Sequence, residues 1–394
     1  MTVRIAIGAV ITGVAFALAG WRLSRLGRLV LSGAPAPGRT RGALRRLGGA
    51  VVEVLGQRKL LKRPQSGIPH ALTFWGFIVL LFTIIEAYGD VFWDKRFAIP
   101  AIGTSAVLGF LEDLFTLVVL AALVTFAVIR LVDDPAKRKR RSRFFGSHTR
   151  AAWLVLALIA VVMLTLLGYR AAQTNTGDFP YGSWAFASHG LGHLLHPLGT
   201  GVNSVLETTL LLCNIAAIMG FLVFLTYSKH LHVFLAPLNV AFSRRPRALG
   251  ALEVTAGTAG AARIEQLSWK HLLDLVTCTE CGRCQAVCPA WNSGKPLSPK
   301  LLVMSLRDHL LASAPLLLGG APGGDGNGSS AKTSALVPDV VDPEILWSCT
   351  TCGACVEQCP VDIEHIDTIA DLRRKLVEEG RLQPGLQSAF HQDL

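Results

Sequence analysis

Five long apolar stretches limit what this chain of 394 residues can fold into. Each approaches or exceeds the ~20 residues that a helix needs to cross a bilayer. The first could be a signal peptide, but it lacks a basic amino-terminal region and a cleavage site of small residues, so we interpret it as a retained anchor. We expect a mainly α-helical protein with spans near residues 5–21, 71–87, 105–131, 151–169 and 205–227.

The composition agrees with a membrane protein. Hydrophobic residues make up 51% of the chain and charged residues 16%, whereas soluble domains carry about 25% charged residues. These values exclude a wholly soluble globular protein and a disordered one. The net charge of +11 could suggest nucleic acid binding, but the basic residues lie beside apolar stretches, so we expect membrane lipid and no nucleic acid as a partner.

The basic residues lie in alternate loops and therefore predict the sidedness of the chain. Residues 22–63 contain eleven Lys and Arg and one acid, Glu53, and further basic runs lie at 137–143 and 244–247. Basic loops stay in the cytoplasm under the positive-inside rule. We therefore expect a multi-pass protein of the bacterial inner (plasma) membrane, with its N-terminus outside and everything after Tyr227 in the cytoplasm.

Two cysteine motifs of identical spacing follow the last apolar stretch. They contain Cys278, Cys281, Cys284 and Cys288, and then Cys349, Cys352, Cys355 and Cys359. Both read C-x2-C-x2-C-x3-C-P, the bacterial spacing for two [4Fe–4S] clusters. Gly282 and Gly353 would permit the tight turn inside each motif.

In this spacing the fourth cysteine of each motif ligates the other cluster. Zinc sites instead pair two cysteines with two further ligands, which fits a repeated four-cysteine run poorly. Two clusters that share ligands in this way indicate a path for electrons. We predict cluster 1 on Cys278, Cys281, Cys284 and Cys359, and cluster 2 on Cys349, Cys352, Cys355 and Cys288.

The chain around the motifs has the apolar spacing of helices, at 264–276, 299–311 and 366–378. This pattern favours an α-helical ferredoxin. Segments rich in Gly, Ser and Ala separate the parts and are typical of flexible linkers. The expected organisation is a membrane domain at 1–243, a linker at 244–262, and a ferredoxin domain at 263–394 with a flexible insert at 319–334.

Three histidines lie at the predicted cytoplasmic ends of spans. His70 opens the second span, and His230 and His232 follow the fifth. Histidines from two helices at one depth could hold a haem b between them, and a solvated interfacial ring is the alternative for any single one. On one helix His230 and His232 would point about 200° apart, so only one can face the bundle.

The histidine-bearing segments resemble the cytochrome b subunit of respiratory nitrate reductases. Five spans, His70, and the run SKHLHVFLAP carry this resemblance. Matched residue by residue, it implies that His70 and His232, rather than His230, ligate a haem b on the cytoplasmic side. The positions that match the outer haem are Leu80 and Asn214, and neither residue is a good ligand, so the resemblance implies one haem.

The predicted outer side carries its own polar residues. His189, His193 and His196 lie on one helical face, and could form a second metal site or an interfacial helix. Four acids near the outer ends of spans are boundary residues in one interpretation and handle protons for a quinone in the other. They are Glu86, Glu112, Asp113 and Glu207.

Nearly the whole chain resembles membrane-bound iron–sulfur oxidoreductases related to heterodisulfide reductase. The segments HALTFWGF, YSKHLHVFLAPLNV and LWSCTTCGACVEQCPVDIEHID carry the likeness, and its best match is the N-terminal half of bacterial electron-transfer-flavoprotein:menaquinone oxidoreductases. The resemblance implies electron transfer from a cytoplasmic flavoprotein of fatty acid β-oxidation to menaquinone. Members of the group continue into C-C-G domains, which this sequence lacks; that domain is a separate subunit, or the sequence is truncated, or the protein works without it.

Two other functions remain open at this point. Electrons could run the other way, from quinol to a cytoplasmic acceptor, as in heterodisulfide reductase. The chain could also be a haem-free membrane-anchored ferredoxin. No flavin or nucleotide fingerprint is present, so a flavin would come from a partner. The sequence does not assign a catalytic residue.

Overall fold

A computed structural model describes residues 2–244, 260–319, 333–382 and 388. Most of the predicted linker at 244–262 and of the predicted insert at 319–334 lies outside the described residues. Within the described residues the secondary structure is helical, apart from one isolated bridge between Ala34 and Ser268. The prediction of a mainly α-helical protein is confirmed.

The chain divides into two compact units. Unit 1 comprises Met1–Arg22, Leu60–Asp134 and His148–Ser228. Unit 2 comprises Leu23–Lys59, Pro135–Ser147 and Lys229–Leu394. This division differs from the expected domains because the two basic loops that follow the first and third spans fold with the cysteine-bearing part of the chain.

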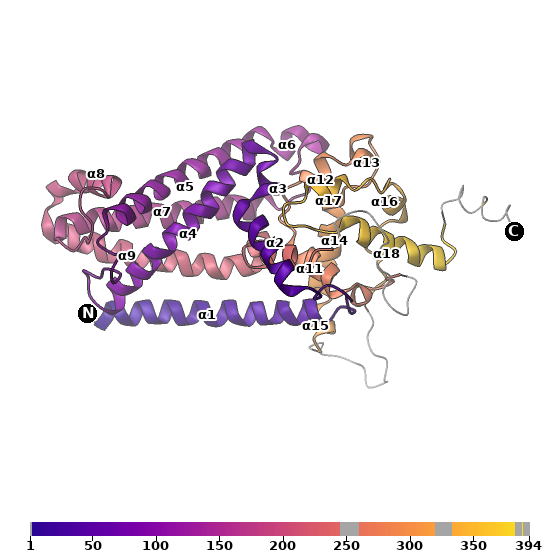
Figure 1. Cartoon of the computed structure of the whole chain (residues 1–394), viewed down its shortest axis with the longest axis horizontal. Helices are drawn as coiled ribbons and strands as arrows, with labels where there is room; N and C mark the ends of the chain where they lie inside the picture. Colours follow the sequence, from indigo (N-terminus) through magenta and orange to yellow (C-terminus); the bar gives the residue numbers. More distant parts are fainter. Residues whose placement is uncertain (1, 245–259, 320–332, 383–387, 389–394) are drawn as a thin grey trace. The chain divides into compact units, whose positions relative to one another are not determined.

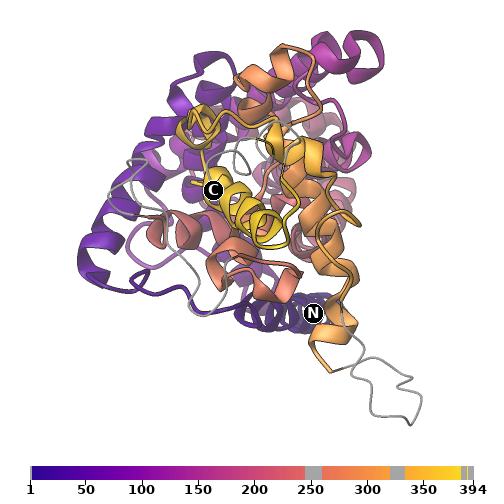
Figure 2. The same cartoon turned by 90° about the vertical axis from the view of Figure 1, so that its right-hand side faces the viewer.

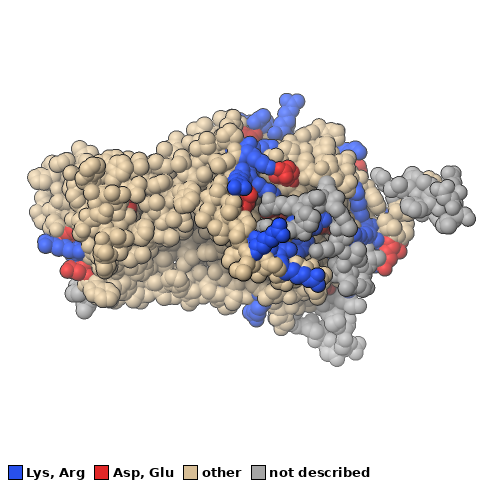
Figure 3. Space-filling model, in the orientation of Figure 1, with Lys and Arg blue, Asp and Glu red and all other residues tan. Residues whose placement is uncertain are grey.

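Unit 1 contains the long apolar helices (Figure 1). They are α1 (Thr2–Leu31), which continues into unit 2, α4 (Pro64–Phe92), α5 (Ala106–Val132), α7 (Thr149–Thr176) and α9 (Gly199–Tyr227), with the shorter α8 (Phe186–Leu195) and the 3-10 helix η2 (His196–Leu198) before α9. Among the residues that the structure describes, five stretches are long and apolar enough to cross a membrane, as predicted. Their outward faces are apolar, and the face drawn in Figure 3 shows few charged side chains over these helices.

The core of unit 1 forms where α4, α5, α7 and α9 meet. Leu80 and Val119 pack there with Leu166 and Ile215, each of which is nearly inaccessible to solvent. By contrast Val124 of α5 is 63% exposed. A bundle with a small apolar interior and an apolar exterior matches the requirements of a lipid environment.

Unit 2 is built from short helices around the cysteine motifs (Figure 2). From the basic loops come α2 (Ala43–Gly56), α3 (Arg58–Leu61), α6 (Pro135–Arg138) and η1 (Lys139–Arg141). The rest of the unit contributes η3 (Lys229–Leu231), α10 (His232–Ala241), η4 (Ile264–Gln266), α11 (Trp269–Thr277), α12 (Arg283–Ala286), α13 (Pro289–Asn292), α14 (Pro299–Ala312), α15 (Ala314–Leu317), α16 (Pro343–Trp347), α17 (Ala354–Gln358) and α18 (His365–Glu378).

The helices predicted near the motifs are present, with one shifted boundary. The segments 299–311 and 366–378 correspond to α14 and α18. The segment 264–276 instead begins as the 3-10 turn η4, and its helix starts only at Trp269. The reason is local, because Leu267 is extended and the side chain of Ser268 accepts a hydrogen bond from the backbone N–H of His271 as an N-cap.

Candidate functional site

The two cysteine motifs adopt the same backbone turn. Glu280 and Gly282 have φ of 55° and 73°, and the equivalent Thr351 and Gly353 have φ of 53° and 74°. A short helix follows each turn, α12 in the first motif and α17 in the second. The left-handed conformation is easiest for glycine, which explains Gly282 and Gly353 in these positions.

The cysteines of the second motif share a cavity with the last cysteine of the first. A small pocket is lined by Cys288, Cys349, Cys352 and Cys355, together with apolar residues that include Leu297 and Ile366. Cys288 thus lies with three cysteines more than sixty positions further along the chain. The spacing predicts these four cysteines as the ligands of cluster 2.

The remaining four cysteines form a second neighbourhood. Burial raises the pKa of Cys284 well above its ordinary value, and the nearby thiols of Cys281, Cys278 and Cys359 raise it further. Cys359 likewise has Cys281 as its strongest charged neighbour. Cys284 and Cys355 also pack together, so the two groups of cysteines adjoin.

The chemistry of these donors fits a bound metal centre. Burial raises the pKa of Cys278 to about 11 and that of Cys355 to about 12, so bound metal would supply the charge that a thiolate needs here. Among the described residues, no three His, Cys, Asp or Glu side chains converge closely enough to hold one metal ion.

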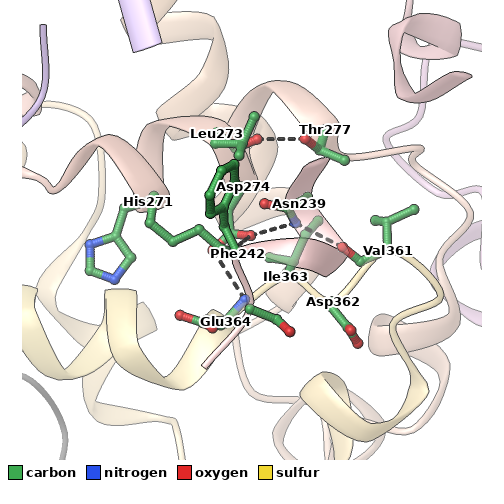
Figure 4. Close-up of polar contacts among 12 residues, drawn as sticks. Asn239, Phe242, His271, Leu273, Asp274, Thr277, Val361, Asp362, Ile363 and Glu364 are labelled. Carbon is green, nitrogen blue, oxygen red and sulfur yellow. Dashed lines mark hydrogen bonds and ion pairs between the residues drawn. The ribbon is translucent and has the colours of Figure 1, made fainter. Parts of the chain in front are cut away.

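A buried polar network ties the segment after Cys359 to α10 and α11 (Figure 4). The amide of Asn239 donates to the carboxylate of Asp274 at 2.7 Å and to the carbonyl of Val361 at 2.7 Å. Lys270 donates to Asp274 at 2.6 Å, and the N–H of Glu364 donates to the same carboxylate at 3.2 Å. The network therefore connects α10, which begins at His232, to the segment before the first cysteine motif and to the segment after the second.

Two carboxyl groups of this network have pKa values that are shifted in opposite directions. Burial raises the pKa of Asp274 to about 6, against the opposing effect of Lys270. Burial alone would also raise the pKa of Glu364, but Lys270 and Arg39 outweigh it and hold this pKa at about 2. Arg39 forms two hydrogen bonds of 2.7 Å with the Glu364 carboxylate, and it comes from the basic loop after the first span.

The expectation that His230 and His232 share one helix is wrong. The helix α9 ends at Tyr227 because Ser228 is extended, with φ −120° and ψ 169°. His230 lies in η3, and His232 is the first residue of α10. The ring centroids of the two histidines are 5.9 Å apart, so the argument from helical periodicity does not separate them.

A contact with the backbone holds the imidazole ring of His232 in one orientation. Its Nδ1 lies 3.1 Å from the carbonyl oxygen of Lys229, a contact in which Nδ1 carries the hydrogen and Nε2 the lone pair. Burial lowers the pKa of His232, which favours the neutral ring. His70 lies in the first two turns of α4, in unit 1.

The other predicted histidines lie in α8 and at the start of η2. His189 belongs to α8, where its ring meets Phe179 edge-on at 5.4 Å. His193 is exposed, and His196 starts the 3-10 helix η2 rather than continuing α8. Of the outer-haem positions, Leu80 is buried, and Asn214 donates to the carbonyl of Val162 at 2.8 Å.

The four acids predicted on the outer side are all buried within unit 1. Glu112 accepts a hydrogen bond from Arg170 at 2.8 Å, and Tyr181 donates to Glu86. Asp113 accepts from the N–H of Ser188 at 2.8 Å and from its hydroxyl at 2.7 Å. Glu207 accepts from Thr176 at 2.9 Å and lies 3.4 Å from the ammonium group of Lys95.

Arg170 is the member of this network that the sequence interpretation missed. The expected span ended at Tyr169 and left Arg170 in a loop, whereas α7 continues to Thr176 and Arg170 is 2% exposed. Within the described part of the chain, Nη1 of Arg170 and Oε1 of Glu112 are buried without a hydrogen-bond partner. The run YRAAQTNT, polar but without Pro or Gly, was the available sign that the helix continues.

Comparison with known proteins identifies the class. A family model described as a 4Fe-4S dicluster domain matches residues 270–360. The chain therefore joins a dicluster ferredoxin region to five candidate membrane-spanning helices. No solved structure matches the chain.

Two relatives match most of the chain. It is 33% identical over 377 residues to the probable iron-sulfur-binding oxidoreductase FadF of Bacillus subtilis, a match that covers 86% of this chain and 51% of the relative. It is 31% identical over 372 residues to the EtfAB:quinone oxidoreductase of Syntrophomonas wolfei, covering 85% of this chain and 49% of the relative. The chain is similar to these two oxidoreductases and spans about half of their length.

A shorter match is to a protein with a different name. A probable membrane-anchored ferredoxin of Chromohalobacter salexigens is 37% identical over 178 residues, which cover 39% of this chain and 26% of the relative. Subunits of heterodisulfide reductases from methanogens match about 30% of the chain. The resemblance to heterodisulfide reductase that the sequence suggested is therefore confirmed.

Proposed function

We propose that the protein transfers electrons between a cytoplasmic redox protein and menaquinone in the membrane, through two [4Fe–4S] clusters and one haem b. The observation that carries the proposal is the pocket that Cys288 shares with three cysteines of the second motif, in a chain whose described residues include five candidate membrane helices. The name of the Syntrophomonas relative, EtfAB:quinone oxidoreductase, supports quinone at one end and electron transfer flavoprotein at the other. A flavoprotein of this kind would connect the protein to fatty acid β-oxidation.

The cysteines would hold the two clusters as the spacing predicts. Cluster 1 uses Cys278, Cys281, Cys284 and Cys359, and cluster 2 uses Cys349, Cys352, Cys355 and Cys288. The cavity that Cys288 shares with the second motif supports this assignment. The clusters would supply one-electron transfer, and the chain's part is to bind them, exclude water and keep them close.

His70 and His232 are the residues that would hold haem b. The contact between His232 Nδ1 and the Lys229 carbonyl supports this role, because ligating histidines commonly donate their other ring nitrogen to a carbonyl. His230 is the weaker candidate, since the resemblance to nitrate reductase cytochrome b places the ligand at His232. The haem would pass electrons between the clusters and the quinone.

The buried acids of unit 1 would serve the quinone and its protons. Reduction of a quinone to quinol takes up two electrons and two protons, so a quinone site needs polar groups inside an apolar bundle. Glu86 with Tyr181, and Glu112 with Arg170, are such groups in α4, α5 and α7 and the loop that follows α7. Intramembrane ionisable residues are rare and mark functional paths by default. Asp113 and Glu207 are buried in the same unit with partners of their own, Ser188 for Asp113 and Thr176 and Lys95 for Glu207.

Sidedness follows from the basic loops. The positive-inside rule gives an inner (plasma) membrane protein with its N-terminus outside and the iron–sulfur unit in the cytoplasm. The membership of the two basic loops in unit 2 supports this arrangement, since loops that fold with the cysteine motifs lie on their side of the membrane. A separate subunit with C-C-G domains remains part of the proposal, because the chain spans about half of its relatives' length.

A second candidate function is a membrane-anchored ferredoxin without haem. The shorter match to the Chromohalobacter protein favours it. A third, quinol oxidation that feeds a cytoplasmic acceptor, uses the same groups in reverse and is favoured by the heterodisulfide reductase matches.

An optical experiment separates these candidates. The protein is purified anaerobically and reduced with dithionite, and the reduced-minus-oxidised spectrum is recorded before and after addition of a menaquinone analogue. The proposal expects a b-type α-band that disappears when the quinone is added. Iron without an α-band would instead support the anchored ferredoxin. Redox potentials of the clusters above that of the haem would favour the reverse direction.

A further inference from the structure

The two cluster-binding turns have the same backbone and different surroundings. Residues 278–282 and 349–353 match position by position, with the left-handed residues Glu280 and Thr351 in equivalent places. Any difference in access to the two turns therefore comes from what packs against them. We refer to residues 278–282 as the first turn and to residues 349–353 as the second turn.

The first turn is covered. Glu280 is 2% exposed, and its carboxylate lies 3.2 Å from Nζ of Lys229 and 2.9 Å from Nη2 of Arg307. A Cβ atom added to Gly282 would lie 2.0 Å from the carbonyl oxygen of Arg143, so the backbone of the basic loop is in close contact with this turn. No side chain larger than that of glycine fits there.

Several of the residues at or next to the first turn contact places where the chain passes between the two units. The hydroxyl of Ser147 donates to the carbonyl of Glu280 at 3.3 Å, and Arg283 donates to the carbonyl of Lys59 at 3.0 Å. Lys59, Ser147 and Lys229 are terminal residues of their segments in unit 2. Their direct chain neighbours, all in unit 1, are Leu60, His148 and Ser228.

The second turn is open. Thr350, Thr351 and Cys352 are all exposed, whereas Cys281, the counterpart of Cys352, is partly covered. The N–H of Thr351 donates to the sulfur of Cys349 at 3.3 Å, and its hydroxyl donates to the carbonyl of Thr350 at 2.8 Å. These hydrogen bonds remain inside the turn and shape it without covering it.

From this difference we infer that the second turn is the surface where the soluble redox protein exchanges electrons, and that cluster 1 is the one that serves the membrane. The inference rests on the proposed function and gives an order to its parts. The partner would give up one electron at the second turn, where Cys349, Cys352, Cys355 and Cys288 would hold the first acceptor, and Cys278, Cys281, Cys284 and Cys359 would hold the next acceptor on the way to the membrane. A partner whose own cofactor lies near its surface could approach cluster 2 directly through Thr350, Thr351 and Cys352.

Solvent access to each cluster can be measured without any partner. The full chain is reduced with dithionite, and the EPR relaxation of its clusters is compared with and without a soluble dysprosium chelate. Cys281→Ser and Cys352→Ser variants assign the signals, since each alters or removes one cluster. We expect the chelate to speed relaxation at least several-fold more for the signal altered by Cys352→Ser. Equal effects, or a larger effect on the other signal, would overturn the inference.

A kinetic experiment tests the partner's approach. Reduced electron transfer flavoprotein is mixed anaerobically with wild type, with Thr351→Arg, and with Val377→Arg, which adds the same side chain on α18 at a residue that is 47% exposed. Thr351→Arg should slow reduction of the clusters at least tenfold, and Val377→Arg should leave it unchanged. An unchanged rate in Thr351→Arg contradicts the inference. If the flavoprotein fails to reduce even wild type, the proposed donor is wrong, and the chelate experiment still decides which turn is open.

Discussion

At the scale of single residues, the cysteine spacing is the most informative part of the sequence. Motif spacing alone predicted that Cys288 lies with the second motif, and the shared cavity has this grouping. Arg170 could not be found in the same way, because an arginine at the end of an apolar run is typical of a loop and its burial depends on Glu112 from another helix. Partners that meet only through tertiary packing leave no local pattern.

The crossed grouping leads to a prediction for Cys288. Cys288→Ala should damage cluster 2, to which Cys349, Cys352 and Cys355 belong, and leave cluster 1 intact. The reason is that Cys288 lines the second motif's cavity although it belongs to the first motif. Cluster-resolved EPR of the reduced variant measures this, and loss of the cluster 1 signal alone would disprove the assignment.

The two neighbouring histidines should differ in their effect on haem. We expect His232→Ala to remove the b-type absorbance and His230→Ala to retain it, because the Lys229 carbonyl orients the His232 ring. Haem content per protein, measured by the pyridine haemochrome assay, distinguishes the variants. The opposite pattern would show that the matched alignment of SKHLHVFLAP is off by two positions.

His365 should make the stability of unit 2 depend on pH. It is 2% exposed, and burial lowers its pKa to about 4, whereas an unfolded histidine titrates near 6.5. Between these values the unfolded chain binds more protons than the folded one, so stability falls as the pH drops from 6.5 to 4, by about 3 kcal/mol in total.

Comparison of wild type with His365→Gln separates the effect of His365 on stability from that of nearby acids. Asp274 and Asp367, whose pKa values burial raises to about 6, change stability in the opposite sense over the same range. His365→Gln should therefore lose less stability on acidification than wild type. Melting temperatures of both proteins at pH 7 and pH 5 measure the difference, and parallel losses would contradict the prediction.

At the scale of helices and turns, the sequence predicted the elements well and their ends less well. Apolar periodicity located α14 and α18, but it could not show that the chain is extended at Leu267 before the Ser268 cap. The predicted fifth span ended at Tyr227, as α9 does, but the pattern did not show that His230 and His232 lie in different helical elements, since the residues from Ser228 to His232 contain neither Pro nor Gly. Helix ends depend on caps and on tertiary contacts that a periodic pattern does not contain.

The pair that joins α5 to α7 allows a prediction at this scale. Arg170→Gln would leave the Glu112 carboxylate buried without its cation, and breaking such a pair costs about 3–5 kcal/mol. The double variant Arg170→Gln, Glu112→Gln should recover much of this loss because no charge is then stranded. Thermal unfolding in detergent compares the three proteins. A double variant no more stable than Arg170→Gln would show that the pair does not interact as described.

At the scale of the whole molecule, the basic loops have two roles. The sequence interpretation assigned their charge to topology alone, whereas Arg39 and Lys59 are buried in ion pairs with Glu364 and Asp362. Arg140 lies 3.7 Å from the centre of the Trp291 ring. These contacts join segments far apart in the sequence, and the local pattern of Lys and Arg does not predict them.

Topology can be tested directly. Alkaline phosphatase is active only outside the cytoplasm, so a fusion in the loop at 94–104 should be active and a fusion at residue 250 should be inactive. A cytoplasmic reporter such as green fluorescent protein should give the reverse pattern at both places. Activity of both phosphatase fusions, or of neither, would contradict the proposed five-span arrangement.

The burial of Arg39 and Lys59 links orientation to maturation. The charges that hold a loop on one side of the membrane are also needed inside the unit that binds metal, beside the residues that follow Cys359. A chain that leaves this loop on the other side of the membrane from the cysteine motifs would separate Arg39 and Lys59 from their acidic partners. We therefore expect correct insertion of the first two spans to be a condition for assembly of the unit that binds iron.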